Sequence, residues 1–315
     1  MSRASYRKLS LTTLLATVGV ILWGAFVRAT GSGAGCGSHW PTCNGEIVPR
    51  APNVATMIEL FHRVTSGLLG FLVLGLVIAA FRTFPKGHPA RGTSLATLFV
   101  LITEALVGAG LVLLELVAEN RSLARGYWMA AHLVNTFLLL ALTTLMVWYG
   151  HRDVRPRISG PWGGRFTVAL VLLTLVGMSG AIAALGDTLF PSTSLAAGIA
   201  ADLSPGAHAL LRLRVIHPFL AGAGATYLLY LAGTLAGRAP SPAGKRLASW
   251  TGGLVLAQLV VGFGNLALLA PTWMQIVHLL LADAVWIATV LLAAEVTSGA
   301  ALPDGSERIA APAGS

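Results

Sequence analysis

Residues 58–81 read Ile-Glu-Leu-Phe-His-Arg-Val-Thr-Ser-Gly-Leu-Leu-Gly-Phe-Leu-Val-Leu-Gly-Leu-Val-Ile-Ala-Ala-Phe. A helix that crosses a membrane needs about 20 predominantly apolar residues, and this stretch is long enough. Strands of a membrane barrel would be about 10 residues long and would alternate polar with apolar side chains. Seven further stretches share this length and polarity, at roughly 10–29, 93–117, 127–149, 166–186, 212–236, 247–269 and 273–296. The sequence therefore predicts an all-α integral membrane protein with eight transmembrane helices.

The composition supports a membrane protein. Of the 315 residues, 55% are hydrophobic and 10% are charged, whereas a soluble domain has about 25% charged residues. The net charge of +9 comes from loops and does not indicate nucleic acid. If the N-terminus is inside, fourteen Lys and Arg lie on the inner side and seven on the outer. The positive-inside rule then predicts cytoplasmic termini, in a bacterial inner membrane, and the first segment lacks the features of a cleavable signal.

Four histidines, His62, His132, His217 and His278, lie near the start of the second, fourth, sixth and eighth apolar segments. Even-numbered segments of a serpentine chain cross the membrane in the same direction. The four imidazoles should therefore lie at similar depth, near the outer face. Ionisable residues inside a membrane are costly and are candidates for function.

The eight segments divide into two halves that resemble a tandem repeat. We expect an N-terminal four-helix bundle over 1–150 and a C-terminal one over 165–300. A polar cytoplasmic linker at 151–164 would join them, and 301–315 would form a flexible tail. Each half has an even number of crossings, so a pseudo-twofold axis along the membrane normal should relate the halves. The 36 glycines allow close helix packing within one chain or in a homo-oligomer.

Two histidines in each half suit the two axial positions of a heme. A single histidine on an apolar segment could instead bridge two helices by a hydrogen bond. Zinc or copper would require further Cys, Asp or His ligands nearby. Four histidines at equivalent positions favour two six-coordinate hemes, held noncovalently because a C-x2-C-H motif is absent.

Glu59 lies three residues before His62, on the same helix face. It is interpreted either as a carboxylate in the first turn of the helix, favoured by the helix dipole and paired with Arg63 or Arg28, or as an acid or base beside a heme. The second half has Arg214 at the position three residues before His217. This asymmetry predicts chemistry in the first half and a structural or electron-transferring heme in the second.

Both cysteines of the chain lie in the loop after the first segment, as Cys36-Gly-Ser-His-Trp-Pro-Thr-Cys43. On the oxidising side of the membrane this spacing suits a disulfide. The disulfide could be a structural staple or could have a redox role. Both interpretations are open.

Further charged residues lie near the outer ends of the segments or inside them. Arg28, Arg63, Arg212 and Arg214 could bind heme propionates or extend to the membrane interface. Glu104 and Asp283 lie within the third and eighth segments, where they could pair helices or move protons.

The run Arg28-Ala-Thr-Gly-Ser-Gly-Ala-Gly-Cys36, followed by Trp40-Pro-Thr-Cys-Asn-Gly45 and Ile47-Val-Pro49, closely resembles the first outer loop of heme A synthases. The sequence Ile58-Glu-Leu-Phe-His-Arg63 resembles the I-E-x-x-H-R signature of that family. The resemblance covers nearly the whole chain, with histidines on segments four, six and eight in the corresponding places.

The resemblance implies that the chain oxidises the C8 methyl group of heme O to the formyl group of heme A. Two successive hydroxylations would give a gem-diol that loses water. His62 and His132 would ligate the substrate heme, and His217 and His278 would ligate a heme b cofactor. Glu59 matches the catalytic carboxylate of the family. Heme O synthase and the assembly of cytochrome oxidase are the expected partners, with a quinone as a plausible electron acceptor.

The chain departs from the family pattern at two places. Many members carry a second cysteine pair between segments five and six, which this chain lacks. His217 is followed by Pro218, whereas His62 is followed by Arg63. Two other functions remain as alternatives: a diheme b-type electron carrier, and a heme transfer protein or chaperone. Glu59, which has no counterpart in the second half, favours the enzyme.

Overall fold

The computed structural model describes residues 1–157 and 160–298, and the predicted tail 301–315 lies outside them. Eight helices are long and apolar enough to span a membrane, with α7 and α8 together forming the sixth span. The prediction of an all-α integral membrane protein is confirmed. The long helices are α1 (Arg3–Ala29), α2 (Val54–Thr83), α3 (Pro89–Leu113), α4 (Leu123–Tyr149), α5 (Pro161–Leu189), α8 (Ile216–Arg238), α9 (Pro242–Ala267) and α10 (Thr272–Thr297). The short ones are η1 (Ser32–Ala34), α6 (Leu195–Leu203) and α7 (Ala209–Arg214).

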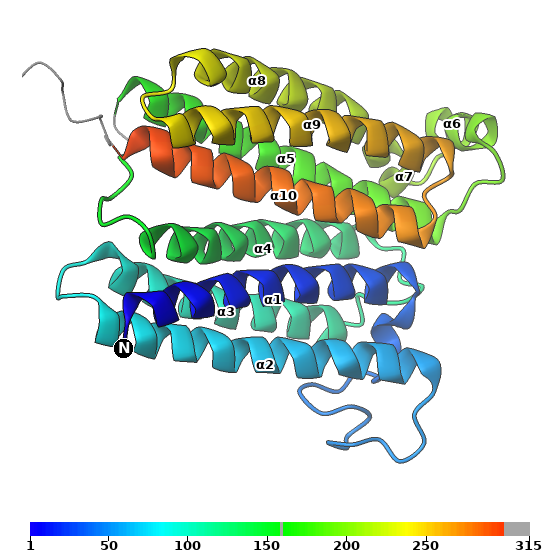
Figure 1. The fold of residues 1–315 in the computed structure, drawn as a ribbon. Helices are drawn as coiled ribbons and strands as arrows, with labels where there is room; N and C mark the ends of the chain where they lie inside the picture. Colours follow the sequence, from blue (N-terminus) through cyan, green and yellow to red (C-terminus); the bar gives the residue numbers. More distant parts are fainter. Residues whose placement is uncertain (158–159, 299–315) are drawn as a thin grey trace, which may run out of the picture.

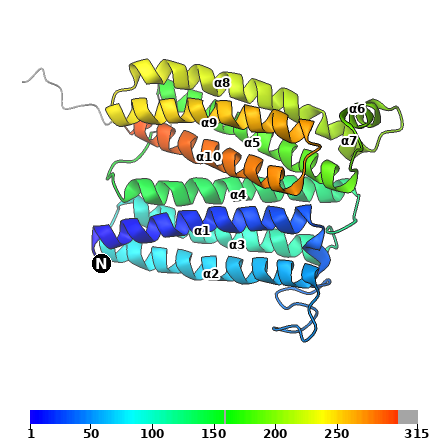
Figure 2. The same ribbon diagram turned by 45° about the vertical axis from the view of Figure 1, so that its right-hand side comes forward.

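The long helices form two bundles. Helices α1 to α4 lie together in one, and α5, α8, α9 and α10 in the other (Figures 1 and 2). Between the bundles, α4 contacts α5 and α10, and α10 contacts α1. In a pseudo-twofold arrangement α4 corresponds to α10 and α1 corresponds to α5. The contact of α4 with α5 then corresponds to that of α10 with α1, and the contact between α4 and α10 corresponds to itself. The division into separate domains at 1–150 and 165–300 stays a prediction, and α5 begins at Pro161, inside the predicted linker.

Some helices begin at a polar N-cap that precedes the apolar segment predicted from the sequence. Asn53 caps α2, and its side chain accepts a hydrogen bond of 2.8 Å from the backbone N–H of Thr56. An N-cap of this kind satisfies a backbone donor that has no partner in the helix. Glu59 consequently lies in the second turn of α2. The expectation that it lies in the first turn is wrong, because the apolar pattern does not include the polar cap.

The sixth span is broken into two helices. Helix α7 ends at Arg214, and α8 begins at Ile216 after Val215. Pro218 has no N–H to donate to the carbonyl of Arg214, so the α-helical ladder cannot run through this point. The preceding loop contains α6, which begins after Ser194. The apolar pattern did not predict α6 as a separate helix.

The two bundles meet at α4 and α10. The rings of Phe137 on α4 and Trp286 on α10 stack with centroids 4.4 Å apart. The indole Nε1 of Trp286 also donates a hydrogen bond of 2.9 Å to the carbonyl of Phe137. This contact combines apolar burial with a satisfied polar group, which is what a buried Trp requires.

The linker that joins the bundles is anchored by ion pairs. Asp153 pairs with Arg3 at the start of α1 and with His88, whose Nε2 lies 3.0 Å from it. The hydrogen bond from Arg3, and after it the one from His88, hold the pKa of the Asp153 carboxyl below its usual range. Arg152 pairs at 2.9 Å with Glu295 near the end of α10. Both halves are therefore tied together at the end where the chain begins.

Candidate functional site

The four histidines lie near the same end of the molecule. Each lies six to nine residues past the first residue of its span, a depth of about 9–14 Å at 1.5 Å per residue. All four of these spans begin at the end that carries the η1 and α6 loops (Figure 1). The structure thus places the predicted ligands at a common depth, below these two loops.

Two of the histidine rings lie against glycines in matching helices. A Cβ atom added to Gly24 of α1 would lie 3.0 Å from Cε1 of His62 on α2. A Cβ atom added to Gly180 of α5 would lie 3.0 Å from Cε1 of His217 on α8. These contacts are closer than ordinary van der Waals contact, so only glycine leaves room for the ring as it stands.

The other two histidines repeat the arrangement. A Cβ atom on Gly262 of α9 would lie 3.0 Å from Cε1 of His278 on α10. On Gly108 of α3 it would lie 4.0 Å from Cε1 of His132 on α4. Each histidine therefore has a glycine facing it from the preceding odd-numbered span. We call these four glycines the seat glycines: Gly24, Gly108, Gly180 and Gly262.

The separation of His217 and His278 fits two axial ligands of one metal. Their ring centroids are 6.4 Å apart, and the ring planes are 89° to each other. A ligating imidazole nitrogen lies about 2 Å from a transition metal. With each ring centre about 1 Å further out, two axial rings have centres about 6 Å apart. This pair could hold a heme iron between α8 and α10.

The ring nitrogens of the histidines are mostly without protein partners. Nδ1 of His62, His132 and His278 is buried and accepts or donates no hydrogen bond within the described residues. Nδ1 of His217 lies 3.1 Å from the hydroxyl of Ser179, beside its seat glycine. A buried polar atom without a partner costs about 1–3 kcal/mol. Nδ1 of these three rings therefore does not join helices by a hydrogen bond within the described residues.

Glu104 on α3 is a neighbour of His132. Its Oε1 lies 3.5 Å from Nδ1 of His132. Asn135 donates from Nδ2 to Oε2 at 2.6 Å, and the Thr136 hydroxyl donates to Oε1. Sequence reasoning noticed Glu104 but did not assign it to His132. Glu104 lies four residues before Gly108, on the same helix face, but the sequence alone does not show that this face is turned toward His132.

Glu59 is buried, with 4% of its surface exposed, and both of its carboxylate oxygens are occupied. Oε1 lies 2.5 Å from Nη2 of Arg63, and Oε2 accepts a 2.8 Å hydrogen bond from the backbone N–H of Cys36. Of the two predicted partners, Arg63 is the one in contact. Glu59 therefore joins the helix that carries His62 to the cysteine loop.

The cysteine loop packs on the start of α2. Cys36 and Cys43 form a disulfide, and both are buried. A Cβ atom on Gly35 would lie 2.4 Å from the carbonyl carbon of Ala55, so the loop approaches the helix backbone where only glycine fits. Arg63 donates from Nη1 to the carbonyl oxygens of His39 at 2.7 Å and Thr42 at 2.6 Å. The loop is held by this guanidinium as well as by the disulfide.

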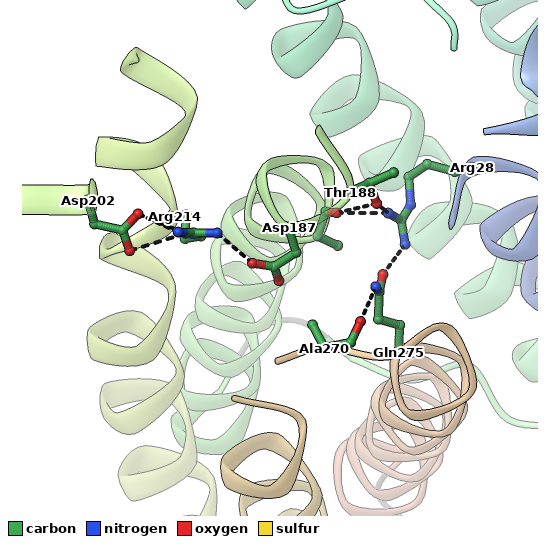
Figure 3. A network of polar contacts seen from close by, with 8 residues as sticks. Arg28, Asp187, Thr188, Asp202, Arg214, Ala270 and Gln275 are labelled. Carbon is green, nitrogen blue, oxygen red and sulfur yellow. Dashed lines mark hydrogen bonds and ion pairs between the residues drawn. The ribbon is translucent and has the colours of Figure 1, made fainter. Parts of the chain in front are cut away.

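Arg28 crosses from the first bundle to the second. Its Nη1 donates to the Ala184 carbonyl and to the Thr188 hydroxyl, both at 2.8 Å. Its Nη2 donates at 2.8 Å to Oε1 of Gln275 on α10, and Nε2 of Gln275 donates at 2.6 Å to the carbonyl of Ala270 (Figure 3). These contacts connect α1 with α5 and α10 near the histidines.

Arg214 occupies in the second half the position that Glu59 occupies in the first. It pairs at 2.8 Å with Asp187 of α5 and at 2.5 Å with Asp202 of α6 (Figure 3). Arg212 donates to the carbonyl of Pro205. The arginines predicted to bind propionates thus all have protein acceptors, and their role toward propionates stays a prediction.

Asp283 is fully buried in α10. Neither of its carboxylate oxygens has a hydrogen-bond partner among the described residues. A buried carboxylate without a partner is strongly unfavourable when it is charged. The sequence placed Asp283 within the eighth segment, and the structure adds that it lies away from the lipid-facing surface.

Comparison with known proteins gives a family and several relatives. The profile of a family described as cytochrome oxidase assembly protein matches residues 7–290. Two proteins from two strains of Thermus thermophilus, both named protoheme IX farnesyltransferase, are 49% identical over 298 residues, 94% of this chain and 48% of theirs. A heme A synthase of Alkalihalophilus pseudofirmus is 31% identical over 159 residues, 50% of this chain and 51% of that protein. The chain spans about half the length of these relatives.

Proposed function

Because the chain belongs to the family of cytochrome oxidase assembly proteins that includes the heme A synthases, we propose that it oxidises heme O to heme A. The family membership supports an oxidoreductase of heme biosynthesis. The specific reaction, its substrate and its residues are the proposal. The chain would act in the pathway after the enzyme that makes heme O and before the assembly of cytochrome oxidase.

The observation that carries the proposal is a histidine that packs on a glycine four times, together with groups that only the first half has. Four histidines lie against four seat glycines at one end of two bundles. The first half adds a buried carboxylate, Glu59, under a disulfide loop. A protein that only carried electrons would need the histidines but not this carboxylate and loop. The asymmetry favours one heme that is changed and one that stays.

In the proposed reaction the C8 methyl group of heme O loses hydrogen in two steps. Each step is a two-electron oxidation that replaces a C–H bond with a C–OH bond, in which water would supply the oxygen atom and two electrons and two protons would be released. The resulting gem-diol loses water to give the formyl group. His62 and His132 would position the substrate, and Glu59 would hold or accept a proton near it. His217 and His278 would hold heme b, which supplies one-electron redox chemistry when it is bound. A quinone would suit as the final electron acceptor.

The name of the Thermus thermophilus relatives raises a second candidate, the transfer of a farnesyl group to protoheme. Those proteins are about twice as long as this chain, so their name can refer to the part that this chain does not match. The paired histidines favour oxidation as the reaction of this chain.

The test is pigment analysis of the purified full chain. Expressed together with a heme O synthase, the chain should yield heme A in the extracted pigment. Expressed alone with heme b and farnesyl diphosphate, it should yield no heme O. Heme O in the second experiment would favour farnesyl transfer, and pigment that stays heme O in the first would refute the oxidation. His217→Ala should mainly deplete heme b, and an unchanged heme b spectrum would reverse the assignment of the halves.

We also propose the orientation of the chain. With both termini cytoplasmic, the cysteine loop, α6 and the four histidines face the outer side of the bacterial plasma membrane. The oxidising environment there suits the disulfide. A membrane-impermeant thiol reagent should label a cysteine introduced at exposed Arg50 in intact spheroplasts, and labelling only after lysis would contradict this orientation.

A further inference from the structure

The two halves differ at a second matched position besides that of Glu59. Glu104 lies four residues before the seat glycine Gly108 on α3, and Gln258 lies four residues before the seat glycine Gly262 on α9. Glu104 lies next to Nδ1 of His132, whereas Gln258 lies next to Nε2 of His278. The first half thus presents a carboxylate to its histidine, and the second half presents a neutral amide.

Two polar side chains hydrogen-bond to the carboxylate of Glu104, and a third fixes one of them. Asn135 donates to Oε2 at 2.6 Å and also donates to the carbonyl of Val100 at 3.0 Å, while its Oδ1 accepts a 2.8 Å hydrogen bond from Thr103. This pattern leaves the Asn135 amide one orientation. Thr136 donates to the other carboxylate oxygen. The carboxylate is therefore held with Oε1 3.5 Å from Nδ1 of His132, and a small rotation of the ring would complete a hydrogen bond.

The second half lacks the whole arrangement. Nε2 of Gln258 lies 3.4 Å from Nε2 of His278. The residues that correspond to Asn135 and Thr136, counted from the histidine, are Leu281 and Ala282. Neither can hold a carboxylate. The difference therefore extends to the groups that would support the charge, and it is not limited to one substitution.

A carboxylate that accepts a hydrogen bond from the free ring nitrogen of a ligating histidine orients the ring and makes the ligand more basic. A more basic ligand favours ferric over ferrous iron, which lowers the reduction potential. We propose that Glu104 is a positioning residue that makes His132 the stronger donor, so that the heme in the first half has a lower reduction potential than the heme in the second half. The inference rests on the proposed ligation by His132.

The consequence is a direction for electron transfer. Electrons move spontaneously toward the site of higher potential. A first-half heme at the lower potential would pass electrons to the second half, away from the site where the substrate is oxidised. The second heme, beside a neutral amide, would receive them. The carboxylate at position 104 and the amide at position 258 would together set this order.

The test is a potentiometric titration of the purified full chain with its bound hemes. The first-half wave is the one that His62→Ala removes. Glu104→Gln should shift this wave to more positive potential and leave the other wave in place. A tenfold change in the preference for ferric iron corresponds to about 59 mV for one electron. Glu115→Gln is the matched control, since Glu115 is an exposed carboxylate just past the end of α3, and it should shift neither wave.

Two further results keep the inference falsifiable. Thr136→Ala keeps the carboxylate but removes one group that fixes it, and it should shift the first wave in the same direction by less. If Glu104→Gln loses heme, the potential of the first-half heme in Thr136→Ala tests the inference instead. Two waves unmoved in the variants that retain heme would overturn the inference. A wild-type chain that binds no heme would instead refute the proposed ligand set.

Discussion

At the scale of single residues, the repeated unit of this protein is a histidine ring against a glycine backbone. It occurs once in each pair of antiparallel spans, and the first and third cases use Gly24 and Gly180 at corresponding places. Because glycine has no Cβ, the ring can approach the neighbouring helix and still lie between helices. The size of this one residue therefore controls the position of the ring.

We expect Gly24→Ala to weaken heme binding in the first half. The new methyl group would lie 3.0 Å from Cε1 of His62, and overpacking of this kind costs about 1–3 kcal/mol. If the ring tilts to relieve the contact, heme affinity should fall about tenfold. Heme content per chain, measured after purification, checks this. Gly19→Ala is the control, since nothing lies within 4 Å of that position on the same helix, and equal heme content in both variants would contradict the prediction.

Glu59 offers a separate residue-scale prediction, because its structural and chemical roles can be divided. Glu59→Gln keeps an oxygen that can accept from the Cys36 N–H but cannot take up a proton. Heme content should stay near that of the wild type, and heme A formation should fall by about 100-fold or more. Pigment analysis and heme content from one preparation give both values. Heme A output at the wild-type level would show that Glu59 only anchors the loop.

At the scale of elements, the cysteine loop is held by a disulfide within the loop and by Arg63 of α2. The disulfide closes the loop on itself, and Arg63 holds the carbonyl oxygens of His39 and Thr42 while pairing with Glu59. Closing a loop of about this length contributes about 2–3 kcal/mol. Hydrogen bonds to a charged group contribute about 1.5–3 kcal/mol each. Arg63 makes two such bonds to the loop, so it contributes at least as much as the disulfide.

We therefore expect the doubly substituted variant Cys36→Ser, Cys43→Ser to keep its loop on α2 and to retain most bound heme. Adding Arg63→Ala should release the loop and make it sensitive to a protease added on that side. The rate of cleavage in membrane vesicles measures this. Arg50→Ala, which removes an exposed guanidinium of the same loop, is the control. Rapid cleavage with the disulfide alone removed would show that the disulfide is the main attachment.

At the scale of the whole molecule, Arg28 links the two bundles beside both histidine pairs. It lies four residues after the seat glycine Gly24, and it binds Gln275, three residues before His278. Its contacts with Ala184 and Thr188 fix it to α5 as well. A shift between the bundles would break these charged hydrogen bonds together.

We expect Arg28→Gln to lower the stability of the contact between the bundles by at least about 3 kcal/mol, because a glutamine replaces at most one of the charged hydrogen bonds. Thermal release of heme, followed by absorbance, should then separate into two transitions, one for each half. Arg50→Gln, whose side chain is 92% exposed, should melt like the wild type. A single unshifted transition for Arg28→Gln would contradict a joining role.

More of the fold than of the candidate site could be predicted from the sequence. Parity alone placed His62 and its three counterparts at one end, because the direction of each span follows from counting. The seat glycines were not predicted. The residues that face each other across two helices depend on how each helix is rotated about its axis, and the apolar segments of the sequence do not determine this rotation. Glu104 was missed as a partner of His132 for the same reason. Helix α6 was missed because its nine residues are too few to stand out from a loop.

The packing at the opposite end of the bundles has an electrical consequence. Two clusters of almost completely buried side chains lie there, with Tyr6, Leu76 and Met146 in the first bundle and Leu235 and Leu292 in the second. Such a region is a thick layer of low dielectric constant, across which most of the membrane voltage falls. A charge that moves through the full voltage changes in energy by about 2.3 kcal/mol per 100 mV. The histidines lie nearer to the outer ends of their spans than to the inner ends, so an electron exchanged with the nearby surface crosses the smaller part of the voltage, and turnover should depend only weakly on the membrane potential.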